Sequence, residues 1–168
     1  MKAEYRAHLL LAGLILLLTI MQIVAGELIS IAGVAPSFLL IGIVFVALLH
    51  GQFAAMLYGF PAGLLVDLYA GEIVGITSLA IVSVAFVIGF FYEEDRRDVL
   101  IRSPRMVLLI LLAGFVFYAV YIFTYFRSLE IDILQLSLLH VFGGMIYSGV
   151  LGSIPVLILA RVDKKLTM

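Results

Sequence analysis

The chain has 168 residues, of which 65% are hydrophobic and 12% are charged, and its formal net charge is −1. This composition is not that of a soluble domain and predicts an integral membrane protein. Its apolar runs reach about 20 residues without the alternation of a membrane-spanning strand, so the predicted fold class is all-α. The lack of cysteine excludes disulfides, thiolate metal sites and a cysteine nucleophile.

The N-terminal segment, residues 1–27, combines a basic start with an apolar core, as a secretory signal peptide does. Ala25 would provide the small residue of a cleavage site. We interpret the segment as an uncleaved first span instead, because its apolar run of about 18 residues is long for a signal peptide. Further apolar runs follow it along the chain.

Six apolar runs predict six transmembrane helices that form a single membrane domain, residues 1–168. The second and third runs are short, since about 14 residues at 1.5 Å each cover roughly 20 Å of a hydrocarbon core about 30 Å thick. They form either two short spans, which we favour, or one re-entrant hairpin. The predicted spans are approximately residues 9–26, 36–50, 52–69, 73–92, 106–126 and 133–160.

The basic residues orient these spans, because cytoplasmic loops collect lysine and arginine. With six crossings and a cytoplasmic N-terminus, every lysine and arginine except Arg127 falls on the inner side, and the C-terminus is cytoplasmic as well. If residues 37–66 formed one crossing, the arginines of residues 93–105 and the basic C-terminus would lie opposite the basic N-terminus, so five crossings are disfavoured. The inner arginines either contact anionic membrane lipid or only set the topology.

A stripe of small residues runs along the third predicted span in steps of four. Residues four apart share one helical face, so the stripe predicts a shallow groove in which another backbone approaches closely. Spacing alone leaves open whether another helix of this chain or a partner protein occupies the groove. The stripe comprises Gly51, Ala55, Gly59, Gly63, Asp67, Gly71 and Gly75.

Three further features concern helix packing. Pro61 lacks a backbone donor and predicts a kink near residues 58–61. A second small-residue series, Gly144, Ser148 and Gly152, follows the sixth span, so we expect the third and sixth spans to be neighbours. Gln22 is interpreted as an amide that bonds between helices.

Asp67 places a carboxylate near the predicted outer end of the third span. A charge at the centre of a span costs about 2.5 to 3.5 kcal/mol, and less near the interface. Asp67 could cap the turn that follows it, since aspartate accepts bonds from nearby backbone N–H groups. It could instead pair with another helix, and His140 of the sixth span is the candidate for a polar pair.

Catalytic motifs are missing from the sequence: it has no nucleophile elbow, zinc-binding histidine pair, phosphate-binding loop or paired carboxylates within a span. We therefore predict no enzyme activity, no metal, no cofactor and no nucleic-acid partner. A solute-binding membrane subunit of an energy-coupling-factor-type transporter is the alternative function. Asp67, Glu72 and His140 would line its outward-facing pocket.

Residues 36–92 contain a motif that resembles a known family. Pro36 opens the second span, residues 59–68 read G-F-x-x-G-L-L-x-D-L, and Gly71 and Gly75 follow. This pattern, the chain length, the six predicted spans and the basic inner loops resemble the bacterial rod shape-determining MreD family. Ser37 departs from the acidic or amide residue often found in the family, and Pro61 interrupts the glycine run. The matching residues are Gly59, Phe60, Gly63, Leu64, Leu65, Asp67 and Leu68.

The resemblance implies a non-enzymatic, multi-pass protein of the bacterial inner (cytoplasmic) membrane that belongs to the cell-elongation machinery. Its direct partner would be MreC, with MreB, RodA and the RodA-associated transpeptidase in the same assembly. Gly59, Gly63 and Asp67 would shape the fold or the partner contact, as would Phe60 and Leu64. The resemblance leaves the presence of a homo-oligomer open.

Overall fold

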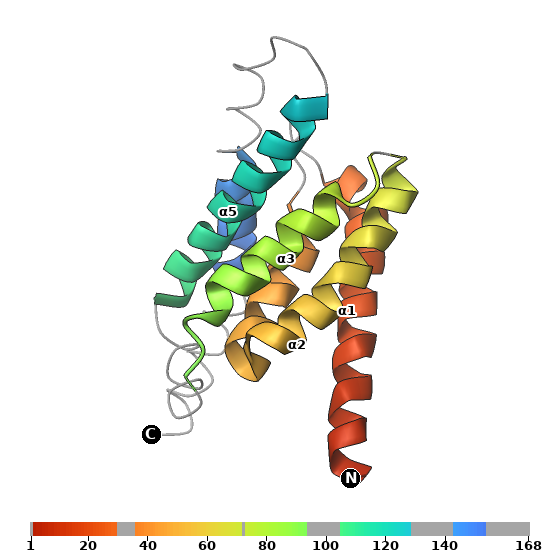
Figure 1. Cartoon of the computed structure of the whole chain (residues 1–168), viewed down its shortest axis with the longest axis vertical. Coiled ribbons are helices and arrows are strands. Elements are labelled where there is room, and N and C mark those ends of the chain that lie inside the picture. Colours follow the sequence, from red (N-terminus) through yellow and green to blue (C-terminus); the bar gives the residue numbers. More distant parts are fainter. Residues whose placement is uncertain (1, 30–35, 72, 94–104, 129–142, 154–168) are drawn as a thin grey trace.

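A computed structural model describes residues 2–29, 36–71, 73–93, 105–128 and 143–153 of the chain. The described chain is helical, as the sequence predicts. Helix α3 lies between α2 and α5, and α1 packs on the other side of α2 (Figure 1). The helices are α1 (Lys2–Leu28), α2 (Phe38–Ala70), α3 (Ile76–Gly89) and α5 (Arg105–Ser128), and residues 143–153 are helical as well.

Helix α2 reverses its direction at Gly51, so its two halves, residues 38–50 and 52–70, form a hairpin (Figure 1). Gly51 has φ 83° and ψ 173°, a left-handed conformation that glycine adopts at no steric cost. The halves pack together: a Cβ on Gly59 would lie 3.2 Å from the Ile43 side chain. The non-helical dihedrals of α2 are at Gly51, not at the kink predicted near Pro61.

The first half of α2 is the centre of the core. Most of its apolar side chains are buried, because α1 and the second half of α2 pack against it. Apolar side chains on the outer faces of these helices, such as Leu10, Phe53 and Leu108, are exposed. An apolar exterior around an apolar core fits a bundle surrounded by lipid tails. The buried residues are Leu39, Leu40, Ile43, Val44, Val46, Ala47 and Leu48.

Length and composition mark two described helical segments, Phe38–Ala70 and Arg105–Thr124, as long and apolar enough to cross a membrane. Because Gly51 divides α2, its halves cover roughly 20 and 28 Å at 1.5 Å per residue. The reversal occurs in both predicted arrangements, two short spans and a re-entrant hairpin. Each described helix overlaps a predicted span, and α1 and α5 extend beyond theirs at both ends. The number of spans and the location of the termini stay predictions.

Helix α3 occupies the groove along the second half of α2. A Cβ on Gly63 would lie 2.6 Å from the Ser78 Cα atom, and one on Gly59 would lie 2.7 Å from Ile81 Cγ2. Gly63 lies opposite Ser78 and Gly59 opposite Ile81, so the two helices are antiparallel. The groove is therefore filled from within the chain over the described residues.

The second small-residue series packs elsewhere. Gly144 lies against the Tyr118 side chain of α5, and a Cβ on Gly152 would lie 2.9 Å from Ile110 of α5 and 3.4 Å from Ile41 of α2. The expectation that the third and sixth spans are neighbours through their small residues is wrong for the described parts. The stripe of α2 instead faces α3, which follows it in the chain through a short connection.

The contact at Gly63 yields a stability prediction. We expect Gly63→Ala to lower stability by about 1 to 3 kcal/mol, because the added methyl group overlaps the α3 backbone, which cannot yield as a side chain can. Thermal unfolding of the purified protein in detergent measures the change. Gly13→Ala is the matched control, because Gly13 is an exposed helical glycine of α1 with no neighbour within 4 Å of a Cβ. Equal melting temperatures for the two variants would contradict the close approach.

Candidate functional site

Asp67 caps the start of α3 from the second half of α2. Its side chain is only 1% exposed. Its Oδ2 atom accepts hydrogen bonds from the backbone N–H groups of Gly75 at 2.8 Å and Ser78 at 3.4 Å, and its Oδ1 atom accepts one from Thr77 at 3.1 Å. The first N–H groups of a helix have no intrahelical acceptor, and the cap residue Gly75 has no side chain that could serve. Asp67 supplies the missing acceptors.

This geometry explains how a carboxylate is accommodated in an apolar bundle. Burying a charge is costly unless it is hydrogen-bonded, and three N–H donors meet that condition. The start of a helix also carries a partial positive charge that favours an anion. Of the two roles predicted for Asp67, the described contacts give capping, with the partners at the start of α3 rather than in the preceding turn. His140, the predicted polar partner, lies outside the described residues.

Three glycines of the predicted stripe serve chain reversals instead of packing. Gly71 ends α2 with φ 67°, and Gly75 precedes α3 with φ 104°. A Cβ on either residue would have no neighbour within 4 Å, so both are removed from the stripe. Gly51 is the reversal within α2, with the Tyr92 ring 3.7 Å from its Cβ position. Of the other members of the stripe, Gly59, Gly63 and Asp67 contact α3, and Ala55 is buried.

Gln52 contacts the opposite end of α3. Its Nε2 atom donates a hydrogen bond to the Phe86 carbonyl at 3.2 Å, and its Cβ and Cα atoms lie against Gly89. The Phe86 carbonyl is in the last turn of α3, where carbonyls lack intrahelical donors. One half of α2 therefore binds both ends of α3. Sequence reasoning overlooked Gln52, although its separation from Asp67, about 22 Å along a helix, matches the length of α3, about 21 Å.

A second capping junction lies at the start of α2. The backbone N–H of Ser37 donates to Ser148 Oγ at 3.0 Å, and the N–H of Phe38 donates to Gln22 Oε1 at 2.7 Å. The Ser37 Oγ atom accepts from the N–H of Leu40 at 3.2 Å. The Ser148 side chain also hydrogen-bonds with Tyr118 of α5. This junction ties α1, α2, α5 and residues 143–153 together.

The junction gives a polar role to two serines of the sequence analysis. Ser148 belongs to the predicted small-residue series, and Ser37 is the position that departs from the family pattern. Both side chains are buried and hydrogen-bonded. A serine directly after Pro36 and two residues before Leu39, the first buried residue of α2, was the available signal, because serine is a preferred N-cap residue.

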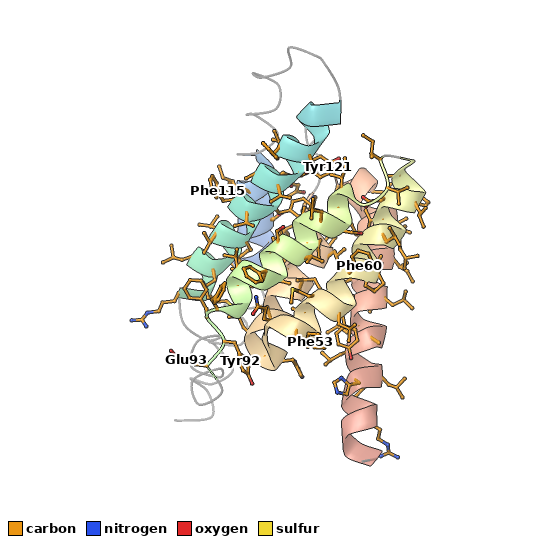
Figure 2. All side chains as sticks on the ribbon, in the orientation of Figure 1. Phe53, Phe60, Tyr92, Glu93, Phe115 and Tyr121 are labelled. Atoms are coloured by element: carbon orange, nitrogen blue, oxygen red, sulfur yellow. The ribbon has the colours of Figure 1, made fainter. Side chains whose placement is uncertain are left out.

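The family-like motif is divided between two faces of α2. Gly59, Gly63 and Asp67 are buried, whereas Phe60 is 53% exposed and Leu64 is partly buried. The labelled Phe53 and Phe60 side chains lie on the second half of α2 (Figure 2). The groove side of the motif thus binds α3, and Phe60 is available to lipid or to another protein.

Metal-binding clusters of three or more histidine, cysteine, aspartate or glutamate side chains are not found in the described residues. The polar side chains at the two junctions described above, such as Asp67, Ser37 and Ser148, act as helix caps. Their chemistry is the satisfaction of backbone donors and acceptors inside an apolar bundle.

Comparison with protein families gives one match. The family model described as rod shape-determining protein MreD matches residues 5–161. Comparisons with curated proteins and with solved structures found no match. The family match extends over nearly the whole chain, far beyond residues 36–92, and confirms the resemblance inferred from the motif.

The Asp67 cap predicts the outcome of two substitutions. We expect Asp67→Ala to lower the free energy of unfolding by about 3 kcal/mol, because it leaves three buried N–H groups without an acceptor. Asp67→Asn should cost less, since it keeps one carbonyl oxygen. Thermal unfolding in detergent ranks the variants. A parent-like melting temperature for Asp67→Ala would show that the cap contributes nothing.

The Ser148 contact is tested within its own helix. Ser148→Ala removes the acceptor of the buried Ser37 N–H and should cost about 1 to 3 kcal/mol. Ser153→Ala is the matched control, because the Ser153 hydroxyl donates an exposed hydrogen bond to the Val150 carbonyl within its own segment. Chemical denaturation monitored by circular dichroism gives both values. The account of the junction is refuted if the two variants lose the same stability.

Proposed function

The chain belongs to the MreD family of rod shape-determining proteins, and from this premise we propose that it is a non-enzymatic membrane scaffold of the bacterial cell-elongation machinery. The family is a membrane protein family with a role in rod shape determination and is not known as an enzyme family. The observation that carries the proposal is the family match over residues 5–161. In the proposed role the chain lies in the inner membrane with several spans and binds MreC directly.

The proposed assembly extends to both sides of the membrane. Through MreC, the chain would be coupled to MreB filaments in the cytoplasm and to the wall synthases RodA and its transpeptidase. The capped and closely packed helices support a scaffold, because a docking platform has to hold one shape. Asp67, Ser37 and Ser148 all engage the chain's own backbone, which favours a structural use of these polar groups.

The partner would contact exposed side chains rather than the glycine groove, because α3 covers Gly59 and Gly63. The second half of α2 also carries a stripe of exposed apolar side chains. Phe60 belongs both to this stripe and to the family-like motif, so we propose the stripe as the contact with the MreC transmembrane helix. Its members are Phe53, Leu57, Phe60, Leu65 and Leu68.

The transporter alternative receives less support. It required Asp67 to line an outward-facing pocket, but this carboxylate is buried and bonded to the start of α3. Glu72 and His140, the other two residues of that pocket, lie outside the described residues.

The scaffold proposal predicts the proteins that accompany this chain in its native membrane. Affinity purification after mild detergent extraction should recover MreC together with wall-synthesis proteins. Depletion of the chain should turn rod-shaped cells round, which microscopy would show. Recovery of a pair of ATPase subunits without any wall-synthesis protein would overturn the scaffold proposal and favour transport.

The proposed contact face predicts the pattern of site-specific cross-links. A photo-cross-linking residue at Phe60 should trap MreC in living cells, because it sits in the middle of the exposed stripe. The photo-cross-linking residue placed at Phe115 is the matched control. Phe115 is 56% exposed, comparable to the 53% of Phe60, but it lies on α5. Equal trapping at both positions, or trapping at Phe115 alone, would refute the α2 face.

A further inference from the structure

The small-residue groove sets how closely α3 approaches α2. Because the small residues repeat every four positions, the groove does not by itself determine the position of α3 along the α2 axis. Gly63 lies opposite Ser78 and Gly59 opposite Ile81. If α3 moved by one turn of four residues toward Gly51, a shift of about 6 Å, Ser78 would face Gly59 and Ile81 would face Ala55. Each position would again be opposite a small residue, so the two arrangements are similar in shape.

The two arrangements differ at the ends of α3. Asp67 accepts bonds from Gly75, Thr77 and Ser78 only in the observed position, and Gln52 reaches the Phe86 carbonyl and Gly89 only there. After a one-turn shift, the start of α3 would lie about 6 Å from its present place, beyond hydrogen-bond reach of Asp67. The connecting residues 71–75 would not prevent the shift, because five residues can extend over about 17 Å.

We propose that Gln52 and Asp67 are register-setting residues, a pair of end clamps that select one of two similar packings of α3 on α2. Buried polar groups specify register in this way when apolar packing is nearly degenerate, and one-turn displacements between packed helices are a known form of conformational change. The clamps define the position of the C-terminal end of α3. Tyr92 follows that end, and its ring lies against Gly51. This inference does not depend on the proposed function.

Cysteine pairs can report the register directly, because the natural chain has no cysteine. Ala55→Cys with Ala85→Cys marks the observed register, since residues 55 and 85 continue the pairing of 59 with 81 and 52 with 89. Ala55→Cys with Ile81→Cys marks the shifted register. Oxidation in native membranes, followed by labelling of the remaining thiols with a maleimide polymer, measures how much of each pair has formed a disulfide.

With both clamps present, the 55–85 pair should form the disulfide and the 55–81 pair should not. With Gln52→Leu and Asp67→Leu together, the ratio of 55–81 to 55–85 disulfide should rise about tenfold or more, because ~1.4 kcal/mol of lost preference changes a population ratio tenfold. Ser83→Ala is the matched control, since its hydroxyl bonds the Leu79 carbonyl within α3 and contacts neither clamp. It should leave the ratio at the parent value.

A merely stabilising role for the clamps would lower the melting temperature without changing the disulfide ratio. An unchanged ratio in the clamp variants, or an equal rise with Ser83→Ala, would therefore overturn the proposal. If the double variant fails to reach the membrane, the milder Gln52→Leu and Asp67→Asn variants are measured singly with the same cysteine pairs. An unchanged ratio in both of these would overturn the proposal equally.

Discussion

The arrangement of this molecule depends on one constraint: the free N–H groups at the start of a buried helix need hydrogen-bond acceptors where no water is available. A backbone donor left unpaired in an apolar medium costs several kcal/mol, so each buried helix start requires a side-chain partner. Two such starts are described here, and other helices serve both. Asp67 of α2 bonds the start of α3, and Gln22 and Ser148 bond the start of α2.

Because these acceptors come from neighbouring helices, each cap is also a tertiary contact. Close approach makes the caps reachable: Gly59 and Gly63 let the α3 backbone lie directly on α2, and the carboxylate four residues after Gly63 reaches the free N–H groups. The Ser78 hydroxyl adds a bond to the Phe60 carbonyl at 3.1 Å on the same contact. The two glycines and the aspartate therefore act as one unit against α3, which accounts for the occurrence of Gly59, Gly63 and Asp67 together in a motif of ten residues.

The sequence predicted the helical class, the apolar runs, the small-residue groove and a capping role for the aspartate, because each follows from local periodicity or from the chemistry of one side chain. Both arrangements predicted for residues 36–69 include a chain reversal near residue 51, but the four-residue repeat also counted Gly51 as a packing residue of the groove. The same repeat wrongly included Gly71 and Gly75, because spacing in a sequence does not show where a helix ends. The partners of Ser37, Gln22 and Gln52 come from distant segments, and such contacts depend on tertiary packing that one sequence does not reveal.

The family assignment and the capped bundle together describe a membrane protein whose polar groups maintain its own architecture. The most direct test of this account is amide hydrogen exchange of the protein in lipid nanodiscs, followed at Gly75, Thr77 and Ser78. The account predicts that these three amides exchange as slowly as the amide of Leu79, whose N–H bonds the Gly75 carbonyl at 2.9 Å within the helix. Fast exchange at Gly75, Thr77 and Ser78 beside a protected Leu79 would contradict it.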